Sequence, residues 1–300
     1  MKTLNGLTLG QQIKSISVIG LGLIGTSLVR AVKAVMSPTQ KIFICGYDNN
    51  FSPRDQKDIL AYGLDRFETN FRFLCASDLI VLASPVQENI KLIKKIRPFV
   101  KATSLVTDVS STKAEMMKSA EQLTNTFIGL HPIAGSELRG YRNSDANLFR
   151  GKPFIVCASK SDLKQPKAAE LLSLIEAIGG EVSVMDAVTH DEVFSRLSHL
   201  PQLVSTLLAT VAEDDLDKAG TGLISLLRLA GSDFAVWQDI LSTNRENVAT
   251  SLDAFSASLK TLSKAIRAGD DKTLSKLFEK ANRAYSKKIE HKLLLSAKRD

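Results

Sequence analysis

The stretch that decides the fold is ISVIGLGLIGTSLVR, which spans Ile16–Arg30. A short apolar run leads into three glycines, Gly20, Gly22 and Gly25, and an apolar helical pattern follows them. In a dinucleotide-binding unit the first glycine permits a tight turn, the second lets a pyrophosphate approach the backbone, and the third lets the helix pack against the strand. We therefore predict a strand, a phosphate-binding turn and a helix whose unpaired N–H groups and dipole attract an anion.

The next apolar run carries the acidic residue of such a unit. Residues 41–47 (KIFICGY) lead directly to Asp48, about 20 residues beyond the last glycine, where an acid binds ribose hydroxyls. Its carboxylate would repel a 2′-phosphate, so we expect NAD as the cofactor. Arg54 lies close enough to keep NADP as the less favoured cofactor, and an ordinary βαβ turn with an acidic loop residue is the alternative interpretation. The expected cofactor contacts are Gly20, Leu21, Gly22, Leu23, Ile24, Gly25, Asp48, Ser84 and Pro85.

The composition is that of an ordinary globular chain. Its 300 residues are 44% apolar and 24% charged, which suits two domains or one large one. The formal net charge of +7 fits an anionic cofactor or substrate. The chain lacks a compact Lys/Arg block with interleaved aromatic residues, so we expect no nucleic-acid partner.

Three features of the sequence predict the subcellular location of the protein. The cysteines, Cys45, Cys75 and Cys157, are far apart and lack metal-binding spacing, so we expect no metal site and a reducing compartment. Residues 1–15 lack the apolar core of a signal peptide. No run of 18 apolar residues predicts a membrane span. Together these features predict a cytoplasmic protein without a membrane partner.

The element pattern divides the chain into two parts. Strands alternating with helices predict an α/β fold, a Rossmann-type dinucleotide-binding domain with a parallel sheet over residues 1–187. No strand is expected over residues 188–300, which predicts an all-helical domain. One of its helices carries a heptad-like apolar stripe that packs within the chain, forms a homodimer interface, or does both. The stripe consists of Leu252, Phe255, Leu259, Leu262 and Ile266.

Helix starts are predicted from capping boxes, in which a threonine precedes a glutamate by three residues. The three boxes begin at Thr112, Thr189 and Thr243. By this prediction His190 lies in the first turn of its helix, where we expect it to be exposed.

Candidate catalytic residues lie at strand ends, because ligands in such folds bind at the carboxyl edge of the sheet. His131 ends a predicted strand at the edge that carries the glycine turn. A histidine with a pKa near neutrality takes a proton from a hydroxyl while a hydride leaves the same carbon. Ser111 follows another strand, where its hydroxyl could bond to the base or to the reacting oxygen. The structural alternatives are a histidine that is satisfied before a proline and a serine that caps backbone N–H groups.

Two polar residues of the helical part are further candidates. Arg228 lies within the apolar stretch LISLLRLAG, and a lone arginine among leucines needs a partner. A substrate carboxylate would bind its guanidinium bidentately, whereas an internal ion pair or a surface position is the alternative. His199 lies beside Pro201, which removes a helix hydrogen bond and kinks the axis. His199 therefore orients a substrate at the kink or simply packs there.

Six motifs resemble, in their order along the chain, those of the prephenate/arogenate dehydrogenase family. They are GLGLIGTS at 20–27, DVSSTK at 108–113, GLHPIAGSE at 129–137, LFRGKP at 148–153, SHLPQ at 198–202 and RLAGSDFAVWQDI at 228–240. The resemblance covers nearly the whole chain, and HPIAGSE and SHLP are more specific than the glycine motif. It implies oxidative decarboxylation of prephenate to 4-hydroxyphenylpyruvate, with NAD⁺ as hydride acceptor, in tyrosine biosynthesis.

The resemblance also implies residue roles. His131 would accept the proton of the ring hydroxyl, Ser111 would assist it, and Arg228 would bind a carboxylate of the small dicarboxylate substrate. The remaining residues implied at the substrate are Ser136, His199 and Gln202.

Two positions depart from the family pattern. Gln202 stands where many members have a second histidine, and Ser225 stands where an acid is usual. The runner-up is therefore arogenate dehydrogenase, with NAD or NADP. Two less favoured hypotheses are a β-hydroxyacid-type dehydrogenase with a lysine base and a non-catalytic NAD-binding sensor or scaffold. We expect no chorismate mutase segment and no added regulatory domain.

Overall fold

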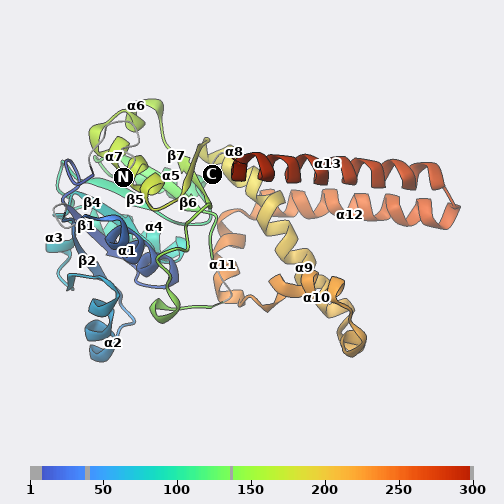
Figure 1. The fold of residues 1–300 in the computed structure, drawn as a ribbon, viewed down its shortest axis with the longest axis horizontal. Coiled ribbons are helices and arrows are strands. Elements are labelled where there is room, and N and C mark those ends of the chain that lie inside the picture. Colours follow the sequence, from blue (N-terminus) through green and yellow to red (C-terminus); the bar gives the residue numbers. More distant parts are fainter. Residues whose placement is uncertain (1–8, 38–40, 136–137, 298–300) are drawn as a thin grey trace. The chain divides into compact units, whose positions relative to one another are not determined.

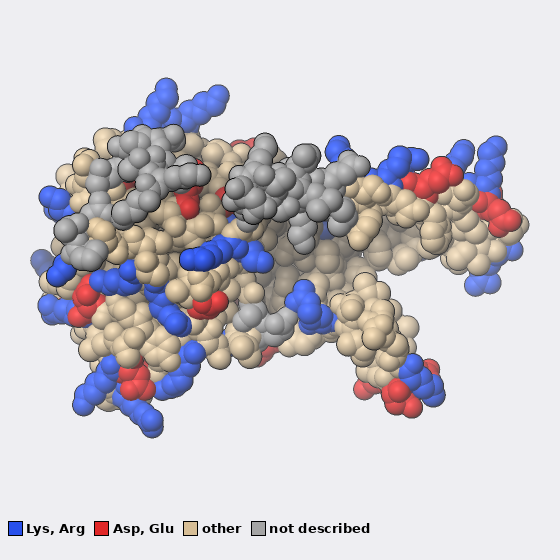
Figure 2. All heavy atoms as spheres, in the orientation of Figure 1, with Lys and Arg blue, Asp and Glu red and all other residues tan. Residues whose placement is uncertain are grey.

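The structure is a computed structural model that describes residues 9–37, 41–135 and 138–297. The chain forms two compact units, Met1–Val248 and Ala249–Asp300. The first unit contains all the strands of the described residues and most of the helices (Figure 1). Lysine and arginine side chains are scattered over the face of the molecule in Figure 2, with acidic side chains among them. No described helix has both the length and the apolar character needed to cross a membrane.

An eight-stranded sheet organises the first unit. Its strand order is β3-β2-β1-β4-β5-β6-β7-β8, so the order reverses beside β1, and ligands bind at such a switch point. The strands are β1 (Ser15–Ile19), β2 (Phe43–Tyr47), β3 (Arg66–Phe67), β4 (Leu79–Leu82), β5 (Leu105–Asp108), β6 (Phe127–Pro132), β7 (Pro153–Cys157) and β8 (Glu181–Val184). The α/β fold with a dinucleotide-type sheet is confirmed.

The prediction of a parallel sheet is right for β1 to β6 and wrong for the last two strands. Strand β7 runs antiparallel to β6, with His131 opposite Ile155, while β8 runs parallel to β7. A parallel pair needs a long crossover, usually a helix. The described part of the β6–β7 connection contains only a 3₁₀ turn, η3 (Tyr141–Asn143), so the chain returns antiparallel to β6.

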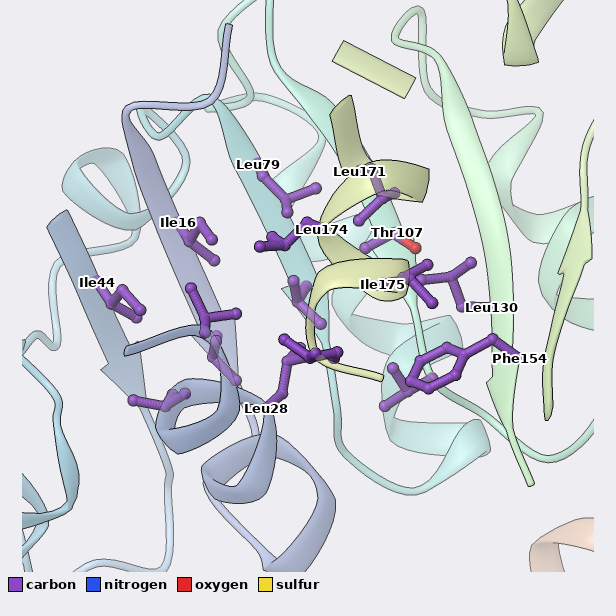
Figure 3. A pocket seen from close by; sticks show the side chains of 16 residues that line it. Ile16, Leu28, Ile44, Leu79, Thr107, Leu130, Phe154, Leu171, Leu174 and Ile175 are labelled. Carbon is purple, nitrogen blue, oxygen red and sulfur yellow. The ribbon is translucent and has the colours of Figure 1, made fainter. Parts of the chain in front are cut away.

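Helices cover both faces of the sheet because successive strand residues point to opposite sides. In β4, Leu79 and Val81 join the core beneath α1 and α7, whereas Ile80 and Leu82 join the core beneath α4 and α5. Figure 3 shows the first of these cores, with apolar side chains of the strands and of α1 and α7 pointing toward one another. The cavity left between them is only about 20 Å³. The helices of this part are α1 (Leu23–Val35), α2 (Pro53–Asp58), α3 (Phe71–Leu74), α4 (Val86–Ile96), α5 (Ala114–Ala120), α6 (Lys160–Leu163) and α7 (Pro166–Ala177).

Only helices and turns follow β8 in the described residues, as the sequence predicts. They are α8 (Ala187–Phe194), a π-helical turn η4 (Ser195–His199), α9 (Leu200–Val211), η5 (Glu213–Lys218), α10 (Thr221–Leu227), η6 (Arg228–Gly231), α11 (Phe234–Thr243), α12 (Arg245–Ala268) and α13 (Asp271–Ala297). Pro201 lies in the first turn of α9, directly after the π-helical turn. The wider turn accommodates a proline whose nitrogen cannot donate to the helix ladder.

The three predicted capping boxes are wrong. Asp186 caps α8, its side chain accepting from the Thr189 N–H, so this helix begins two residues before Thr189. The other two threonines bind each other, with 2.7 Å between the Oγ1 atoms of Thr112 and Thr243. This buried contact joins the start of α5 to the end of α11, where local capping would have left both hydroxyls within their own helices.

The second unit consists of the greater part of α12 and the described part of α13, which run side by side as a hairpin (Figure 1). Asp270 begins α13 by accepting hydrogen bonds from the backbone and hydroxyl of Thr273. The heptad-like stripe is only partly covered within one chain, because Leu259 and Ile266 are exposed. Leu277 and Phe278 of α13 are exposed as well.

Candidate active site

Two cavities lie at the carboxyl edge of the sheet, one beside the residue that precedes α1 and one beside the first turn of α1. The glycine-turn cavity, of about 330 Å³, includes Gly22 in its lining. The histidine cavity, of about 470 Å³, includes Ile24, two residues further along. A ligand that spans the start of α1 would therefore reach from one cavity to the other.

The glycine-turn cavity contains five of the nine residues predicted to contact a cofactor. These are Gly20, Gly22, Asp48, Ser84 and Pro85. The carboxylate of Asp48 accepts the N–H of Leu21 at 2.9 Å and the N–H of Asn50 at 2.9 Å. Asp48 thus fixes the glycine turn to the end of β2 and also faces the cavity. The side chain of Leu21 is buried in the core, and Leu21, Leu23, Ile24 and Gly25 are outside the lining of this cavity.

The three glycines have the backbone geometry expected of such a turn. Gly20 has a φ of 103°, and a Cβ there would lie 2.5 Å from the backbone of Ala83 and Ser84. A Cβ on Gly25 would overlap the carbonyl oxygen of Gly20. A Cβ on Gly22, by contrast, would meet no atom within 4 Å, and no side chain caps α1 at this residue. The open space and the first-turn N–H groups at Gly22 fit a pyrophosphate.

The histidine cavity brings together residues that are far apart in the sequence. Ser111 comes from the loop after β5, His131 from the end of β6, Gln202 from the first turn of α9, and Arg228 from η6. Trp237 of α11 forms part of the apolar wall. Four of the six residues predicted to act on a substrate therefore line one cavity. Ser136 lies outside the described residues.

The placement of His199 differs from that of the other candidates. It is buried and does not line the cavity, whereas the preceding residue, Ser198, does. Its ring packs edge-on against Trp237, and its Nδ1 lies 3.3 Å from the Asn244 amide nitrogen. Burial lowers the pKa of His199 to about 4, so the ring is neutral near pH 7. In this structure His199 supports the wall of the cavity from behind.

His131 is buried and held in its neutral form. Only 8% of its surface is exposed, and its ring lies against Phe194. Burial lowers the pKa of His131 well below its usual value, and positive charge at His190, Lys113 and His199 lowers it further. A neutral imidazole that faces a cavity is able to accept a proton there.

The sequence prediction for His190 is wrong, because this residue is completely buried. Since α8 begins at Ala187, His190 shares a helix face with Phe194, and their rings stack at 4.5 Å. Its Nε2 lies 2.9 Å from Nδ1 of His131, and its Nδ1 lies 2.7 Å from Oδ1 of Asp191. No local motif marks this pair, because its partner is 59 residues away.

Lys113 is the second group that the sequence reasoning missed. Its ammonium group is fully buried and donates to Oδ2 of Asp108 at 2.5 Å and to the carbonyl of Leu130 at 2.6 Å. It therefore ties the end of β5 to the residue before His131. Because it is committed to these acceptors and does not line the histidine cavity, Lys113 does not act as the lysine base of the β-hydroxyacid alternative.

The polar ends of Gln202 and Arg228 are positioned differently. The Gln202 amide nitrogen donates to the carbonyl of Leu229 at 2.8 Å, which leaves its oxygen as the acceptor. Arg228 follows α10, and its side chain is exposed and lines the cavity in a single chain.

A Rossmann-type sheet with an open glycine turn, beside a cavity that holds a buried neutral histidine, defines a nucleotide-binding oxidoreductase. Comparison with known proteins identifies the family. Residues 31–184 match the nucleotide-binding domain of prephenate dehydrogenase, and residues 186–280 match the prephenate dehydrogenase dimerization domain. The chain belongs to the prephenate dehydrogenase family.

Individual relatives agree with this assignment. Cyclohexadienyl dehydrogenase of Zymomonas mobilis is 30% identical over 90% of this chain and 94% of its own length. Prephenate dehydrogenase of Lactococcus lactis is 27% identical over 90% of this chain and 76% of its own length. The crystal structure of Aquifex aeolicus prephenate dehydrogenase with hydroxyphenyl propionate and NAD⁺ superposes with a TM-score of 0.81 at 29% identity, covering 93% of this chain and 98% of the other. Synechocystis arogenate dehydrogenase gives a TM-score of 0.77 at 25% identity, covering 91% and 99%.

Proposed function

We propose that this protein converts prephenate to 4-hydroxyphenylpyruvate and CO₂ with NAD⁺ as hydride acceptor, in tyrosine biosynthesis. The observation that carries the proposal is the convergence of Ser111, His131 and Arg228 on one cavity that lies beside the first turn of α1, directly after the glycine turn. The Aquifex relative, which binds hydroxyphenyl propionate and NAD⁺, supports the same pair of ligands.

His131 acts as the base of the proposed reaction. Its imidazole accepts the proton of the ring hydroxyl while the carbon that bears this hydroxyl loses a hydride. Ser111 donates a hydrogen bond that orients the reacting oxygen, and Arg228 binds a carboxylate of the substrate. Loss of CO₂ then gives an aromatic ring, which makes the overall conversion effectively irreversible.

NAD⁺ is the proposed cofactor, and when bound it would supply the hydride acceptor. Asp48 would bind the ribose hydroxyls, and its negative charge disfavours a 2′-phosphate. Two lysines line the same cavity, but Lys91 is paired with Glu88 at 2.6 Å, and the Lys95 ammonium lies 3.8 Å from the ring centroid of Phe71. A 2′-phosphate beside Asp48 would need a nearby cation to bind it. Both lysines are engaged elsewhere, so NAD is favoured over NADP.

Arogenate is the second candidate substrate, and the geometry of Gln202 favours it. The Gln202 amide nitrogen is committed to the carbonyl of Leu229, so the side chain offers its oxygen as an acceptor. An ammonium group such as that of arogenate would donate to this oxygen, whereas a ketone would not.

A single experiment separates these possibilities. Purified protein is given prephenate or arogenate with NAD⁺ or NADP⁺, and formation of reduced cofactor is followed by absorbance. We expect the highest kcat/KM with prephenate and NAD⁺. A preference for arogenate would move the proposal to the second substrate, and cofactor binding without turnover in all four combinations would establish a non-catalytic binding protein instead.

We also propose a cytoplasmic homodimer, in line with the dimerization domain that residues 186–280 match. All three cysteines are free and buried, which suits a reducing compartment. The exposed apolar residues Leu259 and Ile266 of α12 are suited to pairing with a second copy. Leu259→Asp and Ile266→Asp together should shift the sedimenting species from dimer to monomer, while Lys260→Asp on a neighbouring position serves as the charge control.

A further inference from the structure

A chain of three buried side chains leads from the histidine cavity into the helical part of the first unit. Oδ1 of Asp191 lies 2.7 Å from Nδ1 of His190, and Nε2 of His190 lies 2.9 Å from Nδ1 of His131. His190 and Asp191 are at most 1% exposed, so water does not compete for these hydrogen bonds. From this geometry we propose that His190 and Asp191 are positioning residues that fix the tautomer and the orientation of His131.

The direction of the chain follows from what each atom is able to donate. Both oxygens of Asp191 act as acceptors, since Oδ1 receives the N–H of Lys113 at 2.8 Å and Oδ2 receives the N–H of Ala114 at 2.9 Å. In its neutral form, His190 donates to Asp191 through Nδ1, which leaves its Nε2 as an acceptor. That acceptor requires a proton on Nδ1 of His131. Nε2 of His131 is then unprotonated and is the nitrogen available to take a proton in the cavity.

The same chain of hydrogen bonds connects a carboxylate to the positive charge that forms on His131 when it is protonated. When His131 accepts a proton, the imidazolium faces the ammonium group of Lys113 at the start of α5. The carboxylate of Asp108 is committed to Lys113 at 2.5 Å. Asp191, reached through His190, is the anion that the hydrogen-bonded chain connects to the new charge. Strengthening of the bond from Nδ1 of His131 to His190 would stabilise the protonated base.

The anchoring of Asp191 makes the chain rigid. Its side chain caps the first turn of α5, as the two backbone N–H contacts show, and its carbonyl accepts the Asn244 amide at 2.8 Å. His190 is fixed in turn by stacking on Phe194. A side chain held from two helices and by a stacked ring transmits a defined orientation to His131, whose own backbone belongs to the sheet.

The first test measures tautomers rather than activity. The chain has only four histidines, so a protein labelled with ¹⁵N at histidine gives a simple spectrum, in which His131→Asn assigns the His131 signals. At pH 7.5 we expect His131 to carry its proton on Nδ1. His190→Phe, which retains an aromatic ring against Phe194, should move His131 toward the Nε2–H tautomer. His190→Gln offers an amide oxygen to Nδ1 of His131 and should restore the Nδ1–H tautomer.

The second test measures the kinetic consequence, and it rests on the proposed role of His131 as the base. His190→Phe should lower kcat by at least about 10-fold, with KM for substrate and NAD⁺ changed less than about 2-fold, and His190→Gln should recover part of the lost kcat. An Nε2–H tautomer of His131 in the unaltered protein would overturn the proposal, even if His190→Phe did not fold. Unchanged kcat in a folded His190→Phe protein would also overturn it. Failure of the proposed function is distinct, because it would abolish turnover of the unaltered protein and leave the tautomer result intact.

Discussion

Two glycines of the turn after β1 should respond in opposite ways to the addition of one methyl group. A Cβ at Gly25 would overlap the carbonyl oxygen of Gly20 and lie 3.2 Å from the Cβ of Ala83. A Cβ at Gly22 would meet no atom within 4 Å, and its φ of −74° is accessible to alanine. Gly25→Ala should therefore damage the fold, whereas Gly22→Ala should damage only the binding of a dinucleotide.

The magnitudes follow from these contacts. Overpacking a core costs about 1–3 kcal/mol, and a backbone oxygen yields less than a flexible side chain. In a unit of this size each kcal/mol lowers Tm by about 2–4 °C, so Gly25→Ala should melt roughly 5–10 °C below the unaltered protein. Gly22→Ala should cost less than about 1 kcal/mol of stability. The added methyl group would keep the pyrophosphate from approaching the backbone N–H groups. Loss of one hydrogen bond to a charged group costs about 1.5–3 kcal/mol, so Gly22→Ala should weaken NAD⁺ binding by about 10- to 100-fold.

Scanning calorimetry and isothermal titration with NAD⁺ measure the two effects separately. Gly220→Ala is a matched control, because Gly220 also precedes a helix in an extended conformation and a Cβ there meets no atom within 4 Å. It should bind NAD⁺ normally and report the cost of losing glycine at a helix start. Normal NAD⁺ affinity in Gly22→Ala would refute the phosphate assignment, and an unchanged Tm in Gly25→Ala would refute the packing argument.

Four further predictions concern the histidines and the arginine. His131→Asn should reduce kcat by roughly 10²-fold or more with nearly unchanged NAD⁺ affinity by titration, and equal turnover would remove His131 as the base. Because burial lowers the pKa of His131, the acid limb of kcat/KM should lie below pH 6.5, and a limb above that value would contradict its assignment as the neutral base. Arg228→Ala should mainly raise KM for the substrate in steady-state assays, and an unaltered KM would exclude the carboxylate contact. The folded-state pKa of His199 is lowered from 6.5 to about 4, so its contribution is present above pH 6.5 and is lost as the pH falls toward 4. Urea unfolding at pH 7.5 and 4.5 should therefore show a loss on the order of 2–3 kcal/mol that is absent from His199→Gln, and equal losses would contradict the shift.

Much of the fold was predictable because the glycine turn and the strand ends are local patterns. Gly20, Gly22 and Asp48 lie together as predicted because strand, turn and helix are consecutive, and parallel pairing then brings the end of β2 beside that of β1. The reversed direction of β7 was not predictable from strand spacing, since a chain segment without a crossover helix resembles a long loop in the sequence.

The role of Thr112 and the burial of His190 were not predictable from local patterns in the sequence. Thr112 satisfies the pattern of a capping box, yet its hydroxyl binds Thr243, which lies 131 residues further along. The capping-box rule placed the start of the helix at Thr189, whereas the structure has the cap at Asp186. This misplaced start made His190 appear to be an exposed residue of the first turn. At Thr112 a tertiary hydrogen bond replaced the local one that the sequence indicated, whereas at α8 a different local cap, Asp186, set the start of the helix.

Because β7 runs back alongside β6, the residue proposed as the base belongs to a sheet rather than to a loop. His131 and Pro132 are paired with Ile155 and Phe154, whereas Arg142 of the β6–β7 connection makes a partly exposed ion pair with Asp55. Amide hydrogen exchange should therefore be slow at His131 and fast at the exposed end of the connection. Such a division would let the exposed part of the connection change in length and composition during evolution while the residue proposed as the base keeps its position.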